Sequence, residues 1–365
     1  MTLNNRLYWL AWQLMLPGSG KTVWQIIDHF GGVEPAWHAG EKAFKGVPGI
    51  KSSTIESIIY QRRRINLEQE VTRLEKHGVA FITFDDDNYP IMLKEIFDPP
   101  PVLFVRGQLN SLAGTGVALV GSRKATAYGK TVAQRLAGEL TVSGVNIISG
   151  MARGIDTAAH QGALAAGGYT IAVLGCGLDV VYPRENKALM YEIIEHGAVI
   201  TEFPLGSAPE PWHFPARNRI ISGLSQGVVV VEAADKSGAL ITADFALEQG
   251  KEVMAVPGSI YSNMSKGSHK LLKQGAKLVT EAADILEELG LEVLFDNIEL
   301  ASSHGLKLSV TEQQIYNILQ GDPLHLEDIL RQVELSSQDV MAALMFLEVK
   351  KLVKKLPGKM YVATK

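Results

Sequence analysis

The segment of residues 212–232, WHFPARNRIISGLSQGVVVVE, carries residue types that could bind a flat, negatively charged ligand. It begins with a turn that opens a helix, and the four consecutive valines near its end predict a buried strand. Phe214 can stack on a planar ring, and Asn218 can bond a base edge or hold the turn. The guanidinium groups of Arg217 and Arg219 are planar forks that suit phosphate. These are the groups that hold single-stranded nucleic acid.

The same segment is compatible with a purely structural role. The arginines could instead pair with acidic side chains such as Glu202, and Phe214 could pack in the core. Both interpretations place a cationic, aromatic loop directly before a buried strand. The segment alone favours neither of them, so the decision depends on the other loops that the fold brings to it.

Glycine-rich loops follow several short apolar runs of the chain. They are GSR at 121–123, GMARGID at 150–156, GCGLD at 175–179 and PGS at 257–259. In an open parallel sheet such loops gather at the carboxyl edge of the strands, where ligands bind. Glycine lets the backbone approach a phosphate, the next helix offers free N–H groups, and Arg123 and Arg153 add positive charge. One such loop can be only a tight turn, whereas several with arginine at one edge favour an anion-binding cleft.

The apolar runs themselves predict the fold. Two of them, at residues 79–83 and 102–105, flank a proline-rich stretch and predict an extended entry into the domain. The runs that follow lie at residues 116–120, 145–149, 170–174, 198–201, 228–232, 252–256 and 277–279. Each is short and nearly continuous, and helix-forming stretches separate most of them, which is typical of a parallel sheet buried on both faces. The sequence therefore predicts a doubly wound α/β domain with an extended, Rossmann-like parallel sheet at residues 78–290.

Two smaller domains are predicted beside this sheet. Residues 1–77 have apolar positions at helical spacing, and the turn FKGVPGIK at 44–51 resembles a helix-hairpin-helix, so this part is expected to be a helical, SAM-like or helix-hairpin-helix-like domain. Residues 291–307 read as a linker. Residues 308–365 predict three helices and a hairpin, the winged-helix arrangement, although the third helix has no arginine and contains Asp339 and Glu348.

Composition and missing motifs exclude several other classes of protein. The chain has 365 residues, a single cysteine and a net charge of -4, so it predicts a cytoplasmic protein without a disulfide framework, structural metal site or membrane anchor. The turn Gly18–Thr22 lacks the first glycine of a P-loop, and no G-x-G-x-x-G motif is present. Ser225 lies in a G-x-S-x-G pattern but between a helix and a following strand, the reverse of a hydrolase elbow. No cofactor and no catalytic residue are expected.

Several long motifs of the central domain closely resemble those of the DNA processing protein A family, also called DprA or Smf. They are GSR at 121–123, SGMARGID at 149–156, AH at 159–160, TIAVLGCGLDVVYPREN at 170–186, FPARNRIISGLS at 214–225, VVVEAADKSGALITADFAL at 229–247 and AVPG at 255–258. The match keeps the order of the motifs from about residue 89 to residue 286. Helical and winged-helix-like flanking domains also occur in members of that family, though they vary.

The resemblance implies a recombination mediator that binds single-stranded DNA, helps it past single-strand binding protein and loads RecA during natural transformation. The implied DNA-binding residues are Gly121, Ser122, Arg123, Ser149, Gly150, Arg153, Phe214, Arg217, Asn218, Arg219, Lys236 and Ser237. Phe214 would stack on a base, while Arg123, Arg217 and Lys236 would neutralise phosphates. Which of Arg217 and Arg219 faces the DNA and which braces the loop stays open at this point.

The resemblance also implies that the protein pairs with a second copy of itself. Family members do so through the last strands and helices of the central domain, which places the expected homodimer contact at residues 267–279, overlapping the RecA contact. Leu271, Leu272 and Leu278 in this segment would serve a hydrophobic core equally well.

Two alternative functions are considered. The Rossmann-like architecture also resembles nucleotide phosphoribohydrolases of the lysine-decarboxylase-like group, with Glu232 as the catalytic acid; however, their Pro-Gly-Gly-x-Gly-Thr loop is replaced by KSGALIT at 236–242. The other alternative is a winged-helix regulator whose α/β domain senses a nucleotide. It would require a preference for duplex DNA that depends on residues 308–365.

Overall fold

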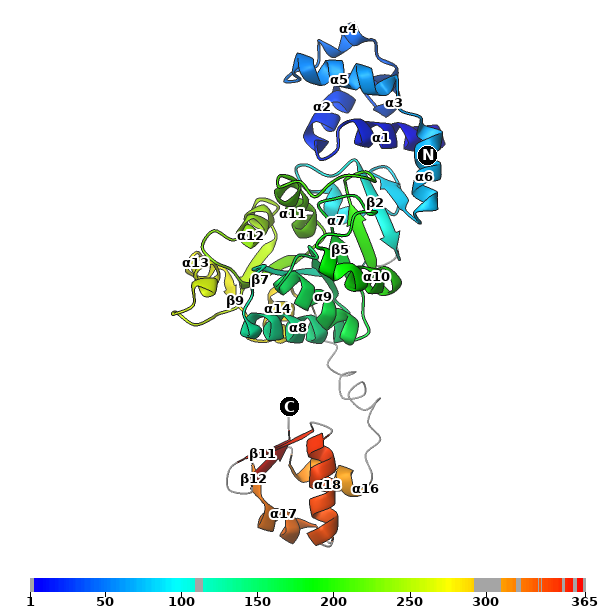
Figure 1. Ribbon diagram of the computed structural model, residues 1–365. Helices are drawn as coiled ribbons and strands as arrows, with labels where there is room; N and C mark the ends of the chain where they lie inside the picture. Colours follow the sequence, from blue (N-terminus) through cyan, green and yellow to red (C-terminus); the bar gives the residue numbers. More distant parts are fainter. Residues whose placement is uncertain are drawn as a thin grey trace. The chain divides into compact units, whose positions relative to one another are not determined.

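The central domain is built on one sheet, which has nine strands in the computed structural model (Figure 1). They are β1 (Ala80–Thr83), β2 (Val102–Gly107), β3 (Gly116–Gly121), β4 (Asn146–Ser149), β5 (Thr170–Val173), β6 (Ala198–Thr201), β7 (Gly227–Glu232), β8 (Glu252–Ala255) and β9 (Lys277–Leu278). Each strand overlaps one of the predicted apolar runs. The structure describes residues 3–108, 114–291, 310–319, 323–333, 335, 337–349, 352–356 and 360–363.

The order in which the chain adds strands changes direction near the centre of the sheet. The order is β1-β2-β6-β5-β4-β3-β7-β8-β9. From β6 to β9 all neighbouring strands are parallel, which confirms the predicted parallel sheet. β1 and β2 are added at one edge as antiparallel strands. The chain proceeds from β3 towards one edge and from β7 towards the other, so the switch point lies between these two strands.

Helices cover both faces of the sheet, as the continuous apolar strands require. On one face pack α11 (His213–Gly223), α12 (Gly238–Glu248) and α13 (Lys266–Lys273). On the other pack α8 (Ala127–Val142), α9 (Ile155–Ala165) and α14 (Ala282–Glu288). α10 (Lys187–His196) lies beside α9 and next to β6 (Figure 1). The strand-to-helix loops therefore converge at the carboxyl edge of the sheet.

The N-terminal helices pack against this domain, and Met1–Val293 form one compact unit. They are α1 (Leu3–Met15), α2 (Gly20–Phe30), α3 (Val33–His38), α4 (Glu41–Phe44), α5 (Ser52–Arg62) and α6 (Leu67–Lys76). Trp12 and Phe44 are fully buried among them. Several side chains join them to the central domain; for example, Gln13 Nε2 donates to the Glu202 carbonyl at 2.6 Å, and Trp24 Nε1 donates to the Pro99 carbonyl at 2.8 Å.

The C-terminal residues Leu294–Lys365 form a second compact unit with its own core, to which Ile315, Ile329 and Leu344 contribute. Its elements are α16 (Val310–Ile318), β10 (Leu324–His325), α17 (Leu326–Gln332), α18 (Ser337–Val349), β11 (Val353–Leu356) and β12 (Met360–Ala363). The predicted helices and hairpin are present, and β10 adds a third strand in the order β10-β12-β11. The predicted linker lies, apart from residue 291, outside the described residues. Within the described ranges no helix combines the length and the apolar character that crossing a bilayer requires.

Candidate nucleic-acid interface

A cleft of about 660 Å³ lies at the carboxyl edge of the sheet, beside the ends of β3 and β7. This is the switch point of the strand order, where open parallel sheets bind ligands. Gly121 and Ser122 line it from the end of β3, and Ser237 lines it from the loop after β7. A side chain at position 121 would not fit, because its Cβ would lie 2.5 Å from Ile155 Cγ1 and 2.8 Å from the Glu232 carbonyl oxygen. The predicted glycine loop after β3 and the loop after β7 thus meet at this cleft.

Helix α11 forms another wall of the cleft. Phe214, Arg217, Asn218 and Ile221 all line it. Their spacing of three, four and seven residues places them on one face of the helix. Asn218 also ties this wall to the start of α12, because its Nδ2 donates to the Gly238 carbonyl at 3.3 Å. The predicted turn is therefore the first part of helix α11, which precedes the buried strand β7. The side of this helix that faces the cleft carries the aromatic and cationic residues.

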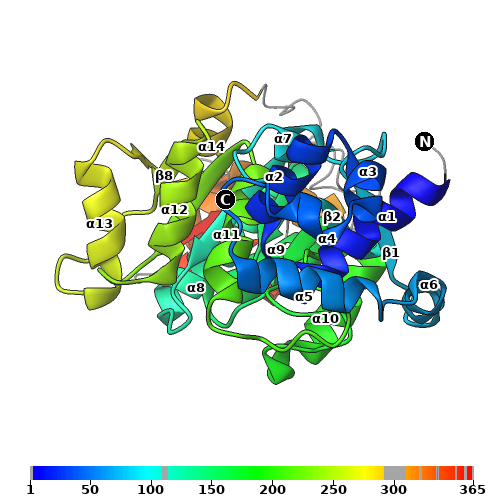
Figure 2. The ribbon, with the colours of Figure 1, turned by 90° about the horizontal axis from the view of Figure 1, so that it is seen from above.

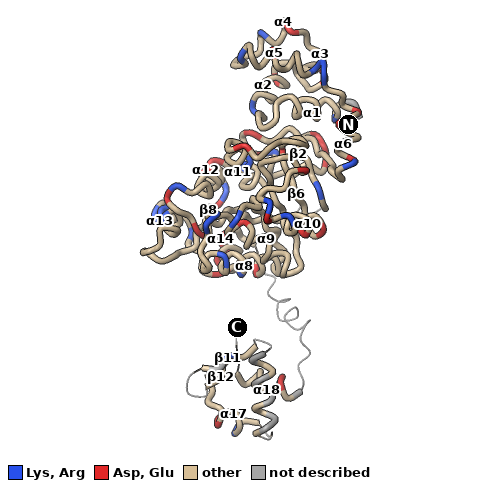
Figure 3. The backbone as a smooth tube through the Cα atoms, viewed as in Figure 1, with Lys and Arg blue, Asp and Glu red and all other residues tan. Residues whose placement is uncertain are grey.

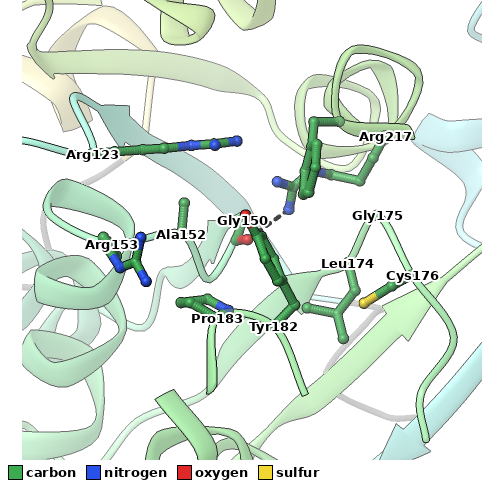
Figure 4. Close-up of a pocket in the computed structure, with 11 residues that line it drawn as sticks. Arg123, Gly150, Ala152, Arg153, Leu174, Gly175, Cys176, Tyr182, Pro183 and Arg217 are labelled. Carbon is green, nitrogen blue, oxygen red and sulfur yellow. Dashed lines mark hydrogen bonds between the residues drawn. The ribbon is translucent and has the colours of Figure 1, made fainter. Parts of the chain in front are cut away.

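Phe214 is half-buried and lies near both a cation and a second aromatic ring. The Arg123 Cζ lies 5.0 Å from the centre of the Phe214 ring, within the range of a cation–π contact. The Tyr182 ring centre lies 5.4 Å away, with the two ring planes tilted by 40°. Figure 4 shows Arg123 and Tyr182 facing the same opening. Arg123 is exposed, so its charge is accessible to a phosphate while the rings offer a surface for a base.

Arg217 lies on the floor of the cleft and is almost fully buried. Its Nη1 donates to the carbonyl of Gly150 at 2.7 Å and also to the carbonyl of Val173, so one guanidinium joins the ends of β4 and β5 (Figure 4). Gly150 makes this possible, because a Cβ there would lie 2.5 Å from the same nitrogen. Burial lowers the pKa of Arg217 to about 10, which still leaves the group charged at neutral pH. Arg217 therefore braces two loops and places a positive charge beneath the cleft.

Asp156, in the first turn of α9, is the acidic group at this floor. It lines the cleft and is buried, and its Oδ2 accepts a hydrogen bond from the Ala152 N–H at 3.3 Å. Burial raises the pKa of its carboxyl, while the charge of Arg217 acts in the opposite direction. Sequence reasoning did not single out Asp156, although it closes the motif SGMARGID. Its carboxylate partly offsets the desolvation cost of the buried guanidinium.

Arg219 does not reach the cleft. Its Nη2 contacts Glu202 Oε2 at 2.7 Å and its Nε contacts Asp98 Oδ2 at 3.3 Å. Glu202 is fully buried, and burial raises the pKa of its carboxyl against the opposing charge of Arg219. The structural interpretation, in which an arginine pairs with Glu202, thus holds for Arg219, whereas Arg217 lines the cleft. The expected place of Arg219 in the DNA pocket is corrected accordingly.

Other predicted site residues occupy different positions. Ser149 is fully buried at the end of β4, and its hydroxyl donates to the Leu119 carbonyl at 2.7 Å, so it supports the sheet and is not part of the cleft surface. Arg153 is exposed, forms an ion pair with Glu185 and lines a small recess of about 20 Å³ beside the cleft. Lys236 is exposed in the loop after β7 but is not among the residues that line the cleft.

Sequence reasoning also missed other cleft residues, three of which have side chains that could contact a ligand. Lys124 and Met264 line the cleft, and Tyr182 lines both the cleft and the small recess. Met264 is placed by a contact in which the Ser122 hydroxyl lies 3.5 Å from its sulfur. Tyr182 could have been found from the sequence, because it belongs to the long motif at 170–186 that carries the family resemblance.

Glu232, the acid that an enzymatic function would require, is engaged elsewhere. It is almost fully buried at the end of β7, and its carboxylate accepts hydrogen bonds from the Thr126 N–H at 2.8 Å and the Thr126 hydroxyl at 2.9 Å. It borders a separate depression of about 490 Å³ that also contains Tyr128 and Ser262. Through these hydrogen bonds Glu232 fixes the start of α8.

Comparisons with known proteins agree with this geometry. The model of the family described as DNA recombination-mediator protein A matches residues 80–290, and that of the DprA winged helix domain matches residues 303–359. The chain is 35% identical to Protein Smf of Synechocystis sp. over 99% of both chains. It is similar to the X-ray structure of DNA processing protein A from Streptococcus pneumoniae, with 37% identity, a TM-score of 0.69 and coverage of 77% of this chain and 97% of that one. A structure of DNA processing protein A from Helicobacter pylori, described by its single-stranded DNA binding mode, has 31% identity, a TM-score of 0.52 and coverage of 57% of this chain and 95% of that one.

Proposed function

Because the chain belongs to the DNA recombination-mediator protein A family, we propose that it binds single-stranded DNA in the cleft at the β3–β7 switch point. The observation that carries this proposal is the group formed by Arg123, Phe214 and Tyr182 above the buried charge of Arg217. It unites a stacking surface with phosphate-binding cations, and these are the two elements of single-strand binding. The Helicobacter pylori relative is described as a single-stranded DNA-binding protein, which supports the same assignment.

Each group has a distinct task in the proposed complex. Phe214 stacks on a base, and the exposed guanidinium of Arg123 binds a neighbouring phosphate. The glycine loops let the DNA backbone approach the sheet edge closely: Gly121 lines the cleft without a side chain, and Gly150 leaves room for the Arg217 guanidinium. Arg217 contributes mainly through its charge, because its Nη1 is already bound to two carbonyl groups.

The finer function follows from the family. We propose that the protein protects incoming single strands, helps them past single-strand binding protein and loads RecA in the cytoplasm during DNA uptake, without a catalytic step. We further propose a homodimer through residues 267–279, which include α13. Leu278 is 47% exposed there and available to a partner, whereas Leu271 is buried in the core.

The test is fluorescence anisotropy of a labelled thymidine oligomer and of a duplex of equal length, measured over a salt series. The wild type is compared with the double variant Arg123→Ala/Phe214→Ala. Loss of a stacked base costs about 1–3 kcal/mol, and loss of a phosphate contact on a single strand flattens the slope of log K against log salt by about 0.7. We expect preferential binding of the single strand and a large loss in the double variant.

A matched control is the pair Arg106 and Tyr191, in which the guanidinium carbon lies 5.5 Å from the ring centre. It reproduces the chemistry of Arg123 and Phe214 on the same domain, and neither residue lines the cleft. Arg106→Ala/Tyr191→Ala should bind DNA as the wild type does. Equal binding by the wild type and Arg123→Ala/Phe214→Ala would instead remove the cleft as the DNA site.

A further inference from the structure

Trp212 is an exposed aromatic residue immediately outside the cleft. Its neighbour Pro211 lines the cleft, while Trp212 itself does not and is 53% exposed. The next residue, His213, is buried, and its Nδ1 lies 3.0 Å from the Gly175 carbonyl oxygen. Trp212 therefore lies at the rim of the cleft, between Pro211, which lines the cleft, and the buried His213. More than half of its surface faces solvent.

The indole of Trp212 rests on a rigid support. Its ring centre lies 4.0 Å from that of His213 and 6.0 Å from that of Phe203, in both cases edge to face. On another side it meets the turn before α2, where a Cβ at Gly18 would lie 2.9 Å from its Cζ3. Gly18 has a φ of +67°, a conformation that glycine adopts without cost. An indole packed in this way would bind a base with little loss of side-chain freedom.

Helix α2, which begins two residues after Gly18, presents a cation near a second exposed ring from another part of the chain. Lys21 is exposed, and its Nζ lies 5.8 Å from the centre of the Phe97 ring, which is 88% exposed. The acidic neighbour Asp98 is oriented away from this pair by its contact with Arg219 Nε at 3.3 Å, an arginine that it shares with Glu202. Seen from above, α2 lies over the part of the central domain that contains α7 (Ile91–Lys94) (Figure 2), and Trp24 of α2 donates to the Pro99 carbonyl after α7 at 2.8 Å. Exposed aromatic and basic side chains are thus present where the start of α2 meets the central domain, beside the turn that contacts Trp212.

We propose that Trp212, Lys21 and Phe97 form an outer station for single-stranded DNA, onto which the strand continues when it leaves the cleft past Pro211. The indole of Trp212 stacks on a base, Lys21 binds a phosphate, and Phe97 offers a further ring. This inference rests on the proposed binding of single strands in the cleft. It gives the N-terminal helices a direct part in binding, and it predicts that affinity depends on strand length beyond what the cleft itself accommodates.

The test uses labelled thymidine oligomers of increasing length, from about 4 to about 16 nucleotides, with the full-length protein. Short oligomers that fill only the cleft should bind Trp212→Ala as tightly as wild type. Longer ones should bind the variant at least about fivefold more weakly, as loss of one stacked base requires. Lys21→Gln should flatten the salt slope by about 0.7, again only for the longer oligomers.

The control is Tyr60, which is 59% exposed and has the Arg64 guanidinium carbon 4.8 Å from its ring centre. It is an aromatic and cationic pair on the same helical region but on α5, away from the rim, so Tyr60→Ala should bind every oligomer as wild type does. A second readout is intrinsic fluorescence. The other tryptophans lie at positions 9, 12, 24 and 37, so quenching by unlabelled DNA should disappear in Trp212→Phe, which keeps a ring at the site.

The outcomes separate the two proposals. If the wild type does not bind single strands at any length, the proposed function fails. If the wild type binds and Arg123→Ala/Phe214→Ala does not, but Trp212→Ala matches the wild type at every length, the cleft stands and the outer station is refuted. Loss of short-oligomer binding in Trp212→Ala would also refute it, because the indole would then act within the cleft or through its support of His213.

Discussion

Replacing Arg219 with methionine tests whether Arg219 stabilises the fold while Arg217, the other arginine of α11, serves the cleft. The change removes the contacts to Glu202 at 2.7 Å and to Asp98 at 3.3 Å, while methionine preserves most of the side-chain volume. The other carboxylate oxygen of Glu202, Oε1, is buried and has no hydrogen-bond partner. The variant therefore leaves a fully buried carboxylate that depended on Arg219 for its charge compensation.

The expected magnitude follows from this burial. Removing one partner of a buried ion pair costs about 3–5 kcal/mol, because the remaining charge stays desolvated. We expect Arg219→Met to lower the free energy of unfolding by that amount at neutral pH. Single-stranded DNA binding by the folded variant should be unchanged, since Arg219 does not line the cleft. The double variant Arg219→Met/Glu202→Gln should recover much of the loss, because the fully buried carboxylate is gone and Asp98, which also loses Arg219, is partly exposed.

The pH dependence has a definite sign. Burial raises the pKa of Glu202 above its value in the unfolded chain, and Arg219 opposes this rise. A raised pKa gives a stabilising contribution that is fully present below the unfolded pKa and is lost as the pH rises through the folded pKa. Without Arg219 the folded pKa rises further. The deficit of Arg219→Met relative to wild type should therefore be largest at neutral pH and shrink on acidification towards about pH 5.

The assay is urea unfolding followed by far-ultraviolet circular dichroism, combined with oligomer anisotropy under folding conditions. Arg73→Met is the control, because Arg73 makes only partly exposed contacts with Glu70 at 3.7 Å and Asp179 at 3.9 Å. Such pairs contribute about 0–1 kcal/mol. A stability loss in Arg219→Met no larger than in Arg73→Met, together with weakened DNA binding, would show that Arg219 acts at the cleft and that this reasoning is wrong.

Three further variants or probes test the cleft itself. Gly150→Ala should displace the Arg217 guanidinium and weaken single-strand binding in anisotropy. Gly138→Ala is the control, because its Cβ would meet no atom closer than 3.5 Å. It should leave binding intact and raise the free energy of unfolding by about 0.5–1 kcal/mol. Arg153→Gln should flatten the salt slope by about 0.7 without changing the melting temperature; an unchanged slope would remove Arg153 from the DNA path. The thiol of Cys176, whose pKa burial raises to about 11, should react with a thiol-specific disulfide reagent at about pH 8 only after unfolding, and rapid reaction of the native protein would contradict its burial.

The sheet could be predicted from the sequence because burial on both faces leaves a continuous apolar run in each strand. β5 and β7, for example, fall on TIAVL and VVVVE with almost the predicted bounds. The glycine loops at the ends of β3 and β4 were likewise visible, since the carboxyl edge of a parallel sheet is fixed once the strands are. The antiparallel direction of β1 and β2 could not be read, because an apolar run does not record which way its neighbour points.

The site was predicted less completely, and helical geometry explains why. Arg217 and Arg219 are two residues apart, so they cannot share a face of α11, whereas Phe214 and Arg217 are three apart and do. Their helical spacing could have shown that only one arginine accompanies Phe214. Glu202 was already considered as a partner, but the spacing along the helix could not show that Asp98, on a distant segment, also contacts Arg219. Ser149 was misplaced for a related reason: the residue that ends β4 still points into the sheet and bonds Leu119.

The buried position of Arg217 reconciles a net charge of -4 with an anionic ligand. An arginine on the open surface would be screened by salt and free to pair with any nearby acid. Arg217 instead is held by the carbonyl groups of Gly150 and Val173, with low-dielectric strands around it, so its field is directed through the cleft. In the proposed complex the exposed Arg123 contacts the single strand directly. Arg123 and Arg217 together can attract a single strand locally, so the protein as a whole need not be basic. For this reason the net charge of -4 was a poor guide to the partner.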